Sequence, residues 1–340
     1  MRTFFVTGGA GFIGAAFVHL ILREFSDVRV INFDALTYAG NLDNLSGLDS
    51  DRHTFVRGDI RDPMAVKESM PMDVDAVVNF AAESHVDRSI ESAHDFVTTN
   101  VVGTQVLLDA ARGTRARKFC HISTDEVMGS LSDGSEEVFT EDSPFAPNSP
   151  YAASKAAAEH LVRAAHHTFG LYTLITRCGN NYGPRQFPEK LIPLAITNAL
   201  QDREVPVYGD GRNVRDWIYV HDHCRAVLQV IERAPAGETY NIGARNEQRN
   251  IEVVESILKA LNKPSSLIKF VTDRPGHDRR YSIDPGKIEK LGWLPRAGWS
   301  EGLEKTIDWY IKNPQWLARV RTGEYLDYYE RQYGERASQK

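Results

Sequence analysis

Tyr151 and Lys155 are the first candidates for chemistry in this sequence. Their spacing of four residues places both on one face of a helix, so they can reach the same ligand. A phenol can take a proton from a sugar hydroxyl near neutral pH if positive charges beside it lower its pKa, and the Lys155 ammonium can supply one. Such a pair is common by chance on a helix. It becomes a strong signal when it is joined to the upstream Ser123-Thr124, which we place at a strand end, and to the turn described next.

A glycine-rich turn at the start of the chain predicts a dinucleotide site. Gly8, Gly11 and Gly14 lie between a short apolar run at 4–6 and a segment at 12–22 that has the helical apolar period. Glycine is needed because the turn must be tight and the backbone must come close to a pyrophosphate, which free helix N–H groups stabilise. The order strand, turn, helix therefore indicates a cofactor turn.

Asp34 ends a second apolar run, 28–33, about 20 residues beyond the glycine turn, where a carboxylate can accept hydrogen bonds from a ribose. NAD is therefore favoured over NADP. The turn-rich stretch 36–41 follows and is either a wrap around the adenosine end of the cofactor or a plain loop. In an NAD site, the positive nicotinamide would be the second charge that lowers the pKa of Tyr151.

The elements that must position these residues alternate along the first half of the chain. We expect strands at 4–6, 28–33, 53–57, 76–80, 118–123 and 172–177, and helices at 12–22, 63–70, 91–112 and 150–168. This order predicts a doubly wound α/β fold with a parallel sheet of the Rossmann type. Helices 91–112 and 150–168 either pack only on the sheet or also meet a partner subunit. Asp59 lies at the carboxyl end of a strand, where it could contact adenine or cap a helix.

The second half of the chain loses this alternation. The segment 129–149 is too long for a plain connection, and helices are expected at 187–200, 221–233 and 299–333. We predict an NAD-binding domain at 1–178, to which a segment near 213–245 could return, and a smaller lobe at 179–340. Three arginines and a histidine crowd into 273–280, which is either a diphosphate clamp or a solvated basic loop.

Composition excludes several classes of protein. A net charge of −6 without a long basic run argues against nucleic acid or an anionic membrane as partner. Three widely spaced cysteines without a Cys-x-x-Cys pair argue against a disulfide framework or a metal site, and buried free thiols are expected. The sequence enters its first strand at once and contains no apolar run of membrane-spanning length, so a cytoplasmic location is expected.

Taken together, the motifs resemble the extended short-chain dehydrogenase/reductase superfamily and, within it, the dTDP-glucose 4,6-dehydratases. The resemblance runs in family order from residue 3 to about 300 and is carried by 7–14, 82–90, 123–127, 151–155, 180–184, 215–217 and 273–277. The first and fourth stretches are shared by the whole superfamily. Thr124-Asp125-Glu126 and the motif at 273–277 are much closer to the dehydratases alone.

The resemblance implies a lyase that removes water from a nucleotide sugar and recycles its NAD. Oxidation at C4 acidifies the C5 hydrogen, a carboxylate removes that proton, and an acid expels the C6 hydroxyl before hydride returns to C6. It implies the following roles: Tyr151 as base for the C4 hydroxyl, Lys155 tuning it and holding the ribose, Thr124 bonding the C4 oxygen, Glu126 taking the C5 proton and Asp125 protonating the leaving hydroxyl. Neighbours in a regular strand point to opposite faces, so the strand must end or bend at Asp125.

The remaining site residues also follow from the turn, the strand ends and the resemblance. For the cofactor we predict contacts from Gly8, Gly11, Phe12, Ile13, Gly14, Asp34, Leu36, Thr37, Asp59, Ile60, Ala81, Ala82, Ser84, Asn100, Tyr151 and Lys155. For the substrate we predict Ser84, Thr124, Asn181, Lys190, Leu191, Arg215, Asn250, Arg274 and His277, with Pro206 and Tyr208 near the base. The resemblance makes 179–340 mainly the nucleotide-sugar-binding lobe, and implies a homodimer joined through helices 91–112 and 150–168.

Two positions depart from the family. Met128 replaces the usual Tyr, which could alter the sugar pocket, and Gly179 stands where Ser is common. A 4,6-dehydratase of a UDP or other sugar therefore stays open. A 4-epimerase or a decarboxylase on the same scaffold needs Tyr and Lys but no acid pair, and Asp125 with Glu126 decides against both. A silent NAD-binding regulator is the alternative from another class.

Overall fold

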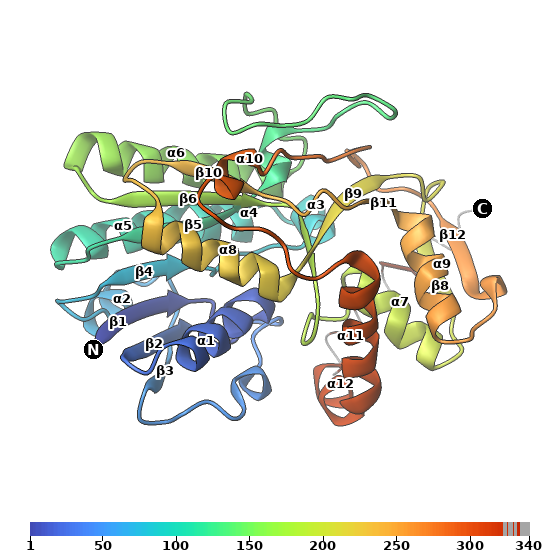
Figure 1. Cartoon of the computed structure of the whole chain (residues 1–340), viewed down its shortest axis with the longest axis horizontal. Coiled ribbons are helices and arrows are strands. Elements are labelled where there is room, and N and C mark those ends of the chain that lie inside the picture. Colours follow the sequence, from blue (N-terminus) through green and yellow to red (C-terminus); the bar gives the residue numbers. More distant parts are fainter. Residues whose placement is uncertain (322–324, 326–328, 330–331, 334–340) are drawn as a thin grey trace.

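A seven-stranded parallel sheet forms the larger part of the computed structural model, which describes residues 1–321, 325, 329, 332 and 333 (Figure 1). Its strand order is β10-β6-β5-β4-β1-β2-β3, and every pairing in it is parallel. The strands are β1 (Arg2–Thr7), β2 (Val28–Asp34), β3 (His53–Arg57), β4 (Ala76–Asn79), β5 (Phe119–Thr124), β6 (Thr173–Cys178) and β10 (Thr239–Ile242). The predicted doubly wound α/β fold is confirmed.

Helices cover both faces of this sheet because successive side chains of each strand point to opposite sides. In β1, Phe4 and Val6 pack in one core with α1 (Phe12–Glu24) and α8 (Val220–Arg233). Phe5 faces the other core, with α2 (Pro63–Ser69), α5 (Thr104–Gly113) and α6 (Pro150–Phe169). Burial on both sides explains why these strands read as nearly continuous apolar runs.

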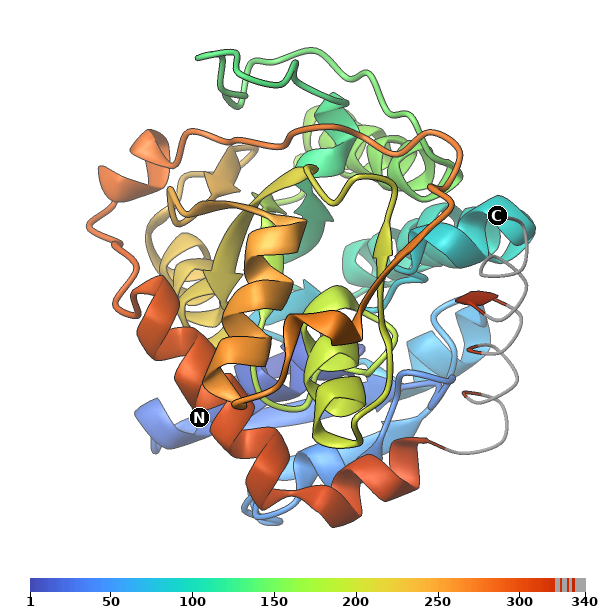
Figure 2. The same cartoon turned by 90° about the vertical axis from the view of Figure 1, so that its right-hand side faces the viewer.

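A smaller lobe lies beyond the carboxyl ends of the strands, at the right of Figure 1 and in front in Figure 2. It holds a three-stranded sheet of β7 (Asn180–Tyr182), β9 (Val214–Tyr219) and β11 (Glu247–Arg249), and the parallel pair β8 (Val205–Tyr208) and β12 (Ile268–Val271). Its helices are α7 (Leu191–Leu200), α9 (Asn250–Ala260), α11 (Trp299–Lys312) and α12 (Pro314–Val320). The lobe has its own core, in which Tyr182, Trp217 and Tyr310 are buried.

The chain returns to the large sheet after it has entered this lobe. Helix α8 packs beside α1, β10 pairs with β6, and the short α10 (Gly286–Glu289) follows near β10. Strand β9 stays in the small three-stranded sheet. The assignment of the two parts to cofactor and sugar nucleotide stays a prediction.

The helix expected at 91–112 is interrupted, so that expectation was wrong. Helix α3 (Val86–Glu91) ends at Ser92, whose backbone is extended with φ −150° and ψ 107°. The chain then resumes as α4 (His94–Phe96), a π-helical segment Val97–Gly103 and α5. The wider π turn lets Asn100 face inward, where it is 1 % exposed.

Two other helices were predicted with the wrong extent because of proline. The segment expected at 187–200 becomes helical only at Leu191, since Pro188 disfavours the helical backbone in the residue before it. The tail expected to be helical over 299–333 contains two helices, because the first ends before Asn313 and Pro314 opens α12. Part of that tail, 322–324, 326–328 and 330–331, lies outside the described residues.

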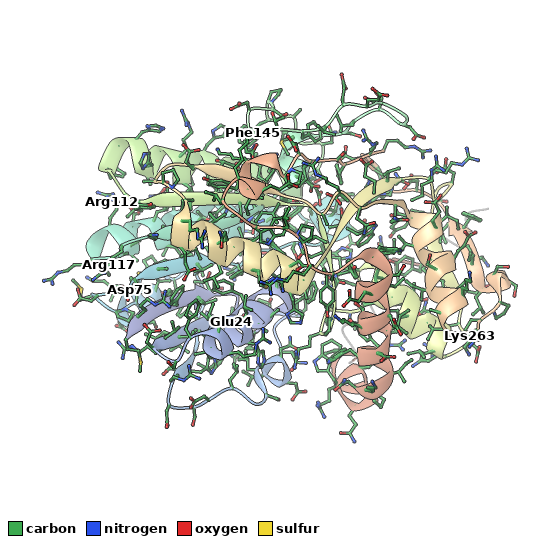
Figure 3. All side chains as sticks on the ribbon, viewed as in Figure 1. Glu24, Asp75, Arg112, Arg117, Phe145 and Lys263 are labelled. Atoms are coloured by element: carbon green, nitrogen blue, oxygen red, sulfur yellow. The ribbon has the colours of Figure 1, made fainter. Side chains whose placement is uncertain are left out.

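The direction of the strands fixes where a ligand can bind. Asp75 directly precedes β4, and Arg117 lies two residues before β5. They form an ion pair of 3.5 Å, and Figure 3 shows them at the end of the sheet away from Lys263 and the small lobe. The carboxyl ends therefore face the lobe, which is where open α/β sheets bind ligands. Among the described residues, no helix is both long and apolar enough to cross a membrane.

Candidate active site

One cleft joins the two parts of the molecule along the carboxyl ends of the large sheet. Its walls come from the turn after β1, the ends of β2, β4, β5 and β6, and the small lobe. Every residue predicted for the site lines this cleft except Leu36 and Asn100. Side chains that are far apart in the sequence are therefore brought together as predicted.

The glycine turn is shaped to hold a diphosphate. Gly8 has φ +69°, and a Cβ on it would lie 2.5 Å from the Ala81 nitrogen; a Cβ on Gly14 would lie 2.2 Å from the Gly8 oxygen. A Cβ on Gly11 would meet only the Gly8 oxygen, at 3.3 Å, so this position faces the open cleft. Helix α1 begins directly after Gly11 without a side-chain cap, which leaves N–H groups for an anion.

Asp34 is held in place at the end of β2 for a ribose. Its Oδ2 accepts a hydrogen bond from the Ala10 N–H at 2.9 Å and its Oδ1 accepts one from the Leu36 N–H at 2.8 Å. Burial raises the pKa of this carboxyl, and the two backbone bonds oppose that change. Leu36 thus orients Asp34 from outside the cleft, with a left-handed backbone of φ 55°. A carboxylate here suits a free ribose hydroxyl and repels a 2′-phosphate, so the turn and Asp34 fit NAD.

Two predicted cofactor contacts have other roles in the structure. The Oδ1 of Asn100 accepts from the Glu83 N–H at 2.9 Å, and its Nδ2 donates to the Glu83 oxygen and to the Ser154 hydroxyl. Asn100 therefore fixes the wall behind the cleft and does not line it. Asp59 lines the cleft, but both carboxylate oxygens accept hydrogen bonds from Arg61. Contact of Asp59 with adenine stays a prediction.

Strand β5 ends immediately before Asp125 and Glu126, so the two acids do not have to follow the alternation of a strand. Strand β5 stops at Thr124, and Asp125–Met128 form a 3-10 turn whose first free N–H, that of Glu126, donates to the Thr124 hydroxyl at 3.3 Å. With three residues per turn, Asp125 and Glu126 are no longer on opposite sides, and both line the cleft. This turn resolves the difficulty that a regular strand would have created.

The two carboxyl groups have different surroundings. Burial and the neighbouring Glu126 raise the pKa of Asp125 well above its usual value. Burial also raises the pKa of Glu126, but Arg274, Lys190 and Arg215 lower it in return. The Oδ2 of Asp125 is buried and has no hydrogen-bond partner among the described residues. Asp125 is thus the better proton donor and Glu126 the better base.

Tyr151 and Lys155 lie on α6, which starts at Pro150 with Ser149 as cap. Burial, with Glu126 nearby, raises the pKa of Tyr151 well above 10, and a hydrogen bond with Thr124 lowers it. Burial lowers the pKa of Lys155 to about 8. The Lys155 ammonium donates to the Ile122 oxygen at 2.6 Å, which fixes it beside the end of β5.

His121 is a neighbour of the site that sequence reasoning missed. Its Nε2 lies 3.4 Å from the Lys155 nitrogen, and its Nδ1 lies 3.3 Å from the Asn79 amide. Burial and Lys155 lower the pKa of His121 well below 6.5, so the ring is neutral. Its place on β5, three residues before Thr124, was the only available signal.

The substrate end of the cleft carries three basic side chains. Lys190, Arg215 and Arg274 line it, and the Lys190 ammonium donates to the Ser84 oxygen at 2.8 Å. Buried atoms without a partner among the described residues include Asn181 Oδ1, Asn250 Oδ1 and Arg274 Nε. Buried polar atoms of this kind normally have partners, so they suit a polar ligand with a diphosphate.

The basic turn at 273–280 divides, so a clamp of three arginines was wrong. Arg274 and His277 line the cleft, whereas Arg279 pairs with Asp133 and Asp210 at 3.2 and 2.9 Å. Arg280 pairs with Glu247 at 2.7 Å. Only the first arginine is therefore placed for a ligand.

Asp87 is the most informative residue that the site analysis of the sequence left out. It is 3 % exposed, it pairs with Arg274 at 3.1 Å, and its Oδ2 accepts from the Tyr208 hydroxyl at 2.9 Å. His85, Glu189 and Tyr281 also line the cleft. The polar cluster at 82–90 was the signal for Asp87 and His85, but no spacing rule assigns them a partner.

The two departures from the family, Met128 and Gly179, lie differently with respect to the cleft. Met128 does not line it; its side chain packs with Phe139 and Ile283, and its sulfur lies 3.6 Å from Arg177 Nη1. The expected effect of Met128 on the sugar pocket was wrong. Gly179 does line the cleft, and a Cβ on it would lie 2.7 Å from the Asp216 oxygen. A serine there would require a local shift.

All three cysteines are buried free thiols, as the sequence predicted: Cys120, Cys178 and Cys224. Cys178 lines the cleft, and burial raises its pKa to about 12. The thiol is therefore protonated and a poor nucleophile. No cluster of metal-ligating side chains occurs among the residues that the structure describes.

Comparison with known proteins finds sugar-nucleotide dehydratases that match this chain over nearly its full length. The family model for GDP-mannose 4,6 dehydratase matches residues 5–306. A dTDP-glucose 4,6-dehydratase of Xanthomonas campestris pv. campestris (strain B100) is 52% identical over 96% of this chain and 97% of its own length. DesIV, a dTDP-glucose 4,6-dehydratase from Streptomyces venezuelae solved with NAD and TYD bound, is 49% identical with a TM-score of 0.90, covering 94% of this chain and 100% of that one. The dTDP-glucose 4,6-dehydratase of Bacillus anthracis, solved with NAD, is 46% identical with a TM-score of 0.86 over the same shares.

Proposed function

Since this chain belongs to the GDP-mannose 4,6 dehydratase family and, within it, to the dTDP-glucose 4,6-dehydratases, we propose that it converts dTDP-glucose to dTDP-4-keto-6-deoxyglucose and water. The cofactor is NAD, which the glycine turn and Asp34 fit. NAD takes a hydride from C4 of the sugar and returns it to C6, so no reduced cofactor accumulates. The large-sheet part then holds NAD, and the smaller lobe holds most of the nucleotide sugar.

The acid pair carries this proposal. Asp125 and Glu126 both reach the cleft beside Tyr151, and their surroundings separate them into a proton donor and a base. An epimerase or a decarboxylase needs no such pair to expel water. A silent NAD-binding regulator needs neither the pair nor Tyr151 with Lys155.

The catalytic residues divide the steps of the reaction among them. Tyr151 takes the proton of the C4 hydroxyl, with Lys155 lowering the cost of the phenolate and Thr124 hydrogen-bonded to the C4 oxygen. Glu126 then removes the C5 proton, which the new ketone has made acidic. Asp125 gives its proton to the C6 hydroxyl, which leaves as water. Glu126 returns its proton to C5 as C6 is reduced.

The sugar nucleotide is held by the small lobe. Lys190, Arg215 and Arg274 supply the positive charge for the diphosphate, and Pro206, Tyr208 and Leu191 line the wall where we place the base. Since Met128 points away from the cleft, it gives no reason to prefer UDP-glucose over dTDP-glucose.

Two further properties belong to the proposal. We propose a homodimer joined through the helices at 86–113 and α6, because Ile90, Val97 and Val102 are 37%, 49% and 48% exposed on the first of these. Light scattering on the purified protein measures its molar mass in solution and so tests for the dimer. We also propose a cytoplasmic location, and the negative net charge supports the proposal that the protein has no nucleic-acid or anionic-membrane partner.

Product analysis by mass spectrometry is the direct test. Purified protein with NAD is incubated separately with dTDP-glucose and with UDP-glucose. Loss of one water without net NADH, faster for dTDP-glucose, is the expected result. An isomer of unchanged mass would identify an epimerase.

A further inference from the structure

The proposed reaction leaves the catalytic groups one proton out of place after each turnover, and this inference rests on that reaction. Oxidation at C4 moves the hydroxyl proton to Tyr151, and the loss of water takes a proton from Asp125. Glu126 removes the C5 proton and later gives it back, so its own balance is zero. Tyr151 therefore ends with the proton that Asp125 has lost, and one proton must move between them before the next turnover.

Thr124 lies between these two groups. Its hydroxyl donates to Asp125 Oδ1 at 3.3 Å, and it shares a hydrogen bond with the side chain of Tyr151. The N–H of Glu126 donates to the same oxygen at 3.3 Å and fixes the position of the hydroxyl at the start of the 3-10 turn. The donor order needed for transfer, Tyr151 to Thr124 to Asp125, is therefore possible without moving any backbone.

Transfer of a proton between Tyr151 and Asp125 by way of bulk water is hindered, because these side chains are buried. Tyr151, Thr124 and Asp125 are 9%, 7% and 2% exposed even without a ligand in the cleft. Among the described residues, Thr124 is the hydrogen-bond partner of Asp125 Oδ1, and Oδ2 has none. The position of Oδ1 therefore faces Thr124, and the position of Oδ2 is the one left to meet the sugar.

We propose that the Thr124 hydroxyl is a proton relay that resets the site by passing the proton of Tyr151 to Asp125. The Tyr151 O–H bond breaks as Thr124 Oγ1 gains that proton, and the original Thr124 proton forms a bond to Asp125 Oδ1. Threonine is unchanged, a phenol becomes a phenolate, a carboxylate becomes a carboxylic acid, and no electrons are transferred. Rotation of the neutral carboxyl about its Cβ–Cγ bond then presents the proton to the next substrate.

The surroundings of Asp125 favour its return to the protonated form. Burial and Glu126 raise the pKa of Asp125 well above its usual value, so its carboxylate accepts a proton readily. Burial and Glu126 also raise the pKa of Tyr151, and the hydrogen bond with Thr124 opposes that rise. A positive nicotinamide beside the phenol would lower this pKa.

Removing the hydroxyl without changing the shape tests the relay. Thr124→Val is compared with Thr124→Ser, which keeps the hydroxyl, by following product formation with limiting enzyme from the first turnover onward. Loss of a bond to the C4 oxygen alone slows every turnover equally. Loss of the relay slows later turnovers more than the first. We therefore expect Thr124→Val to show a burst of about one product per site. The ratio of its first-turnover rate to its steady-state rate should be at least about tenfold larger than the same ratio in the wild type.

Thr176→Val is the matched control. Thr176 is fully buried in β6, and its hydroxyl has no partner among the described residues, so its loss should leave the ratio unchanged. A linear progress curve for Thr124→Val, slowed equally in all turnovers, would overturn the relay, as would a burst in Thr124→Ser equal to that in the valine variant. NAD content and the melting temperature are measured for each variant to confirm folding. If the wild-type protein forms no dehydrated product, the proposed function has failed and the relay is not the cause.

Discussion

At the scale of single residues, the surroundings of two neighbouring carboxyl groups give them different affinities for a proton. Asp125 is buried against Glu126, and Arg215 is the cation that opposes the rise of its pKa. Glu126 is influenced by Arg274, Lys190 and Arg215 together. The charged form is therefore disfavoured more strongly at Asp125, although both side chains come from one turn of the chain. Their difference in role depends on residues more than 60 positions away.

Replacing Glu126 by glutamine should separate oxidation from elimination. The amide cannot take the C5 proton, so Glu126→Gln should let substrate reduce bound NAD but should form dehydrated product about 10²- to 10⁴-fold more slowly. Stopped-flow absorbance of NADH and mass spectrometry of the products measure the two steps. Glu136→Gln, an exposed residue of the loop at 129–149, is the control and should behave as wild type. Full turnover by Glu126→Gln would rule out its assigned role.

Lys155 should give the reaction a limit on the alkaline side. Burial lowers its pKa to about 8, with Glu159 and Cys178 opposing that shift and the neutral His121 beside it. The ammonium that supports the Tyr151 phenolate is present below this pH and is lost as pH rises through it. We therefore expect kcat/KM to fall above about pH 8, and Lys155→Met to show a lower, flat profile in the same range. An unchanged alkaline limb in the variant would assign that limb to another group.

At the scale of elements, two turns decide what the site can do. The 3-10 turn Asp125–Met128 brings both acids into the cleft, and the turn from β1 into α1 brings backbone close to the place of the diphosphate. Both lie at carboxyl ends of parallel strands, where the chain leaves the sheet and side chains are free of its alternation. The sheet therefore positions the candidate functional groups, which lie in the turns at the carboxyl ends of its strands.

The glycine turn can be tested with a single methyl group. In Gly8→Ala the new Cβ would lie 2.5 Å from the Ala81 nitrogen at a backbone φ of +69°, so we expect loss of NAD on purification and a stability lower by about 1–3 kcal/mol. Gly113→Ala, at the end of α5, meets no atom within 4 Å and serves as control. Cofactor content and urea unfolding measure both effects. Retention of NAD by Gly8→Ala would show that the close backbone approach at Gly8 is not needed for the cofactor to bind.

At the scale of the whole molecule, the site exists only because two lobes meet. Arg274 comes from the small lobe, and Asp87 comes from the segment after β4; their ion pair of 3.1 Å crosses the cleft. Lys190 crosses it as well, with its bond to the Ser84 oxygen. A nucleotide sugar in the cleft therefore touches both lobes, and binding energy should appear as resistance to unfolding.

Two arginines of the same turn offer a matched test of this bridge. Arg274→Ala should raise KM for dTDP-glucose by about 10- to 100-fold, because hydrogen bonds to charged groups are worth about 1.5–3 kcal/mol. It should also reduce the rise in melting temperature that dTDP causes. Arg279→Ala removes only pairs with exposed Asp133 and Asp210 and should stay within about twofold of wild type. Equal effects in the two variants would place the diphosphate elsewhere.

The fold class, the glycine turn and the candidate reacting groups could all be predicted from the amino-acid sequence. The apolar period, the glycine spacing and the order of strand ends depend on residues close together in the sequence. They can therefore be recognised without knowing which distant residues are in contact. They were insufficient at 91–112 and 299–333, where the extended backbone at Ser92 and the start of a new helix at Pro314 interrupt an otherwise helical pattern.

Only the tertiary structure decided which of the polar residues face the ligand. It placed Arg274 in the cleft and gave Arg279 and Arg280 to other carboxylates, turned Met128 away, and put Thr124 between Tyr151 and Asp125. Pairing between residues distant in the chain depends on how the lobes pack, and no spacing in the sequence encodes it. The chemistry was therefore readable from residue types, whereas the partners and protonation of each group followed from burial and from neighbours that folding supplied.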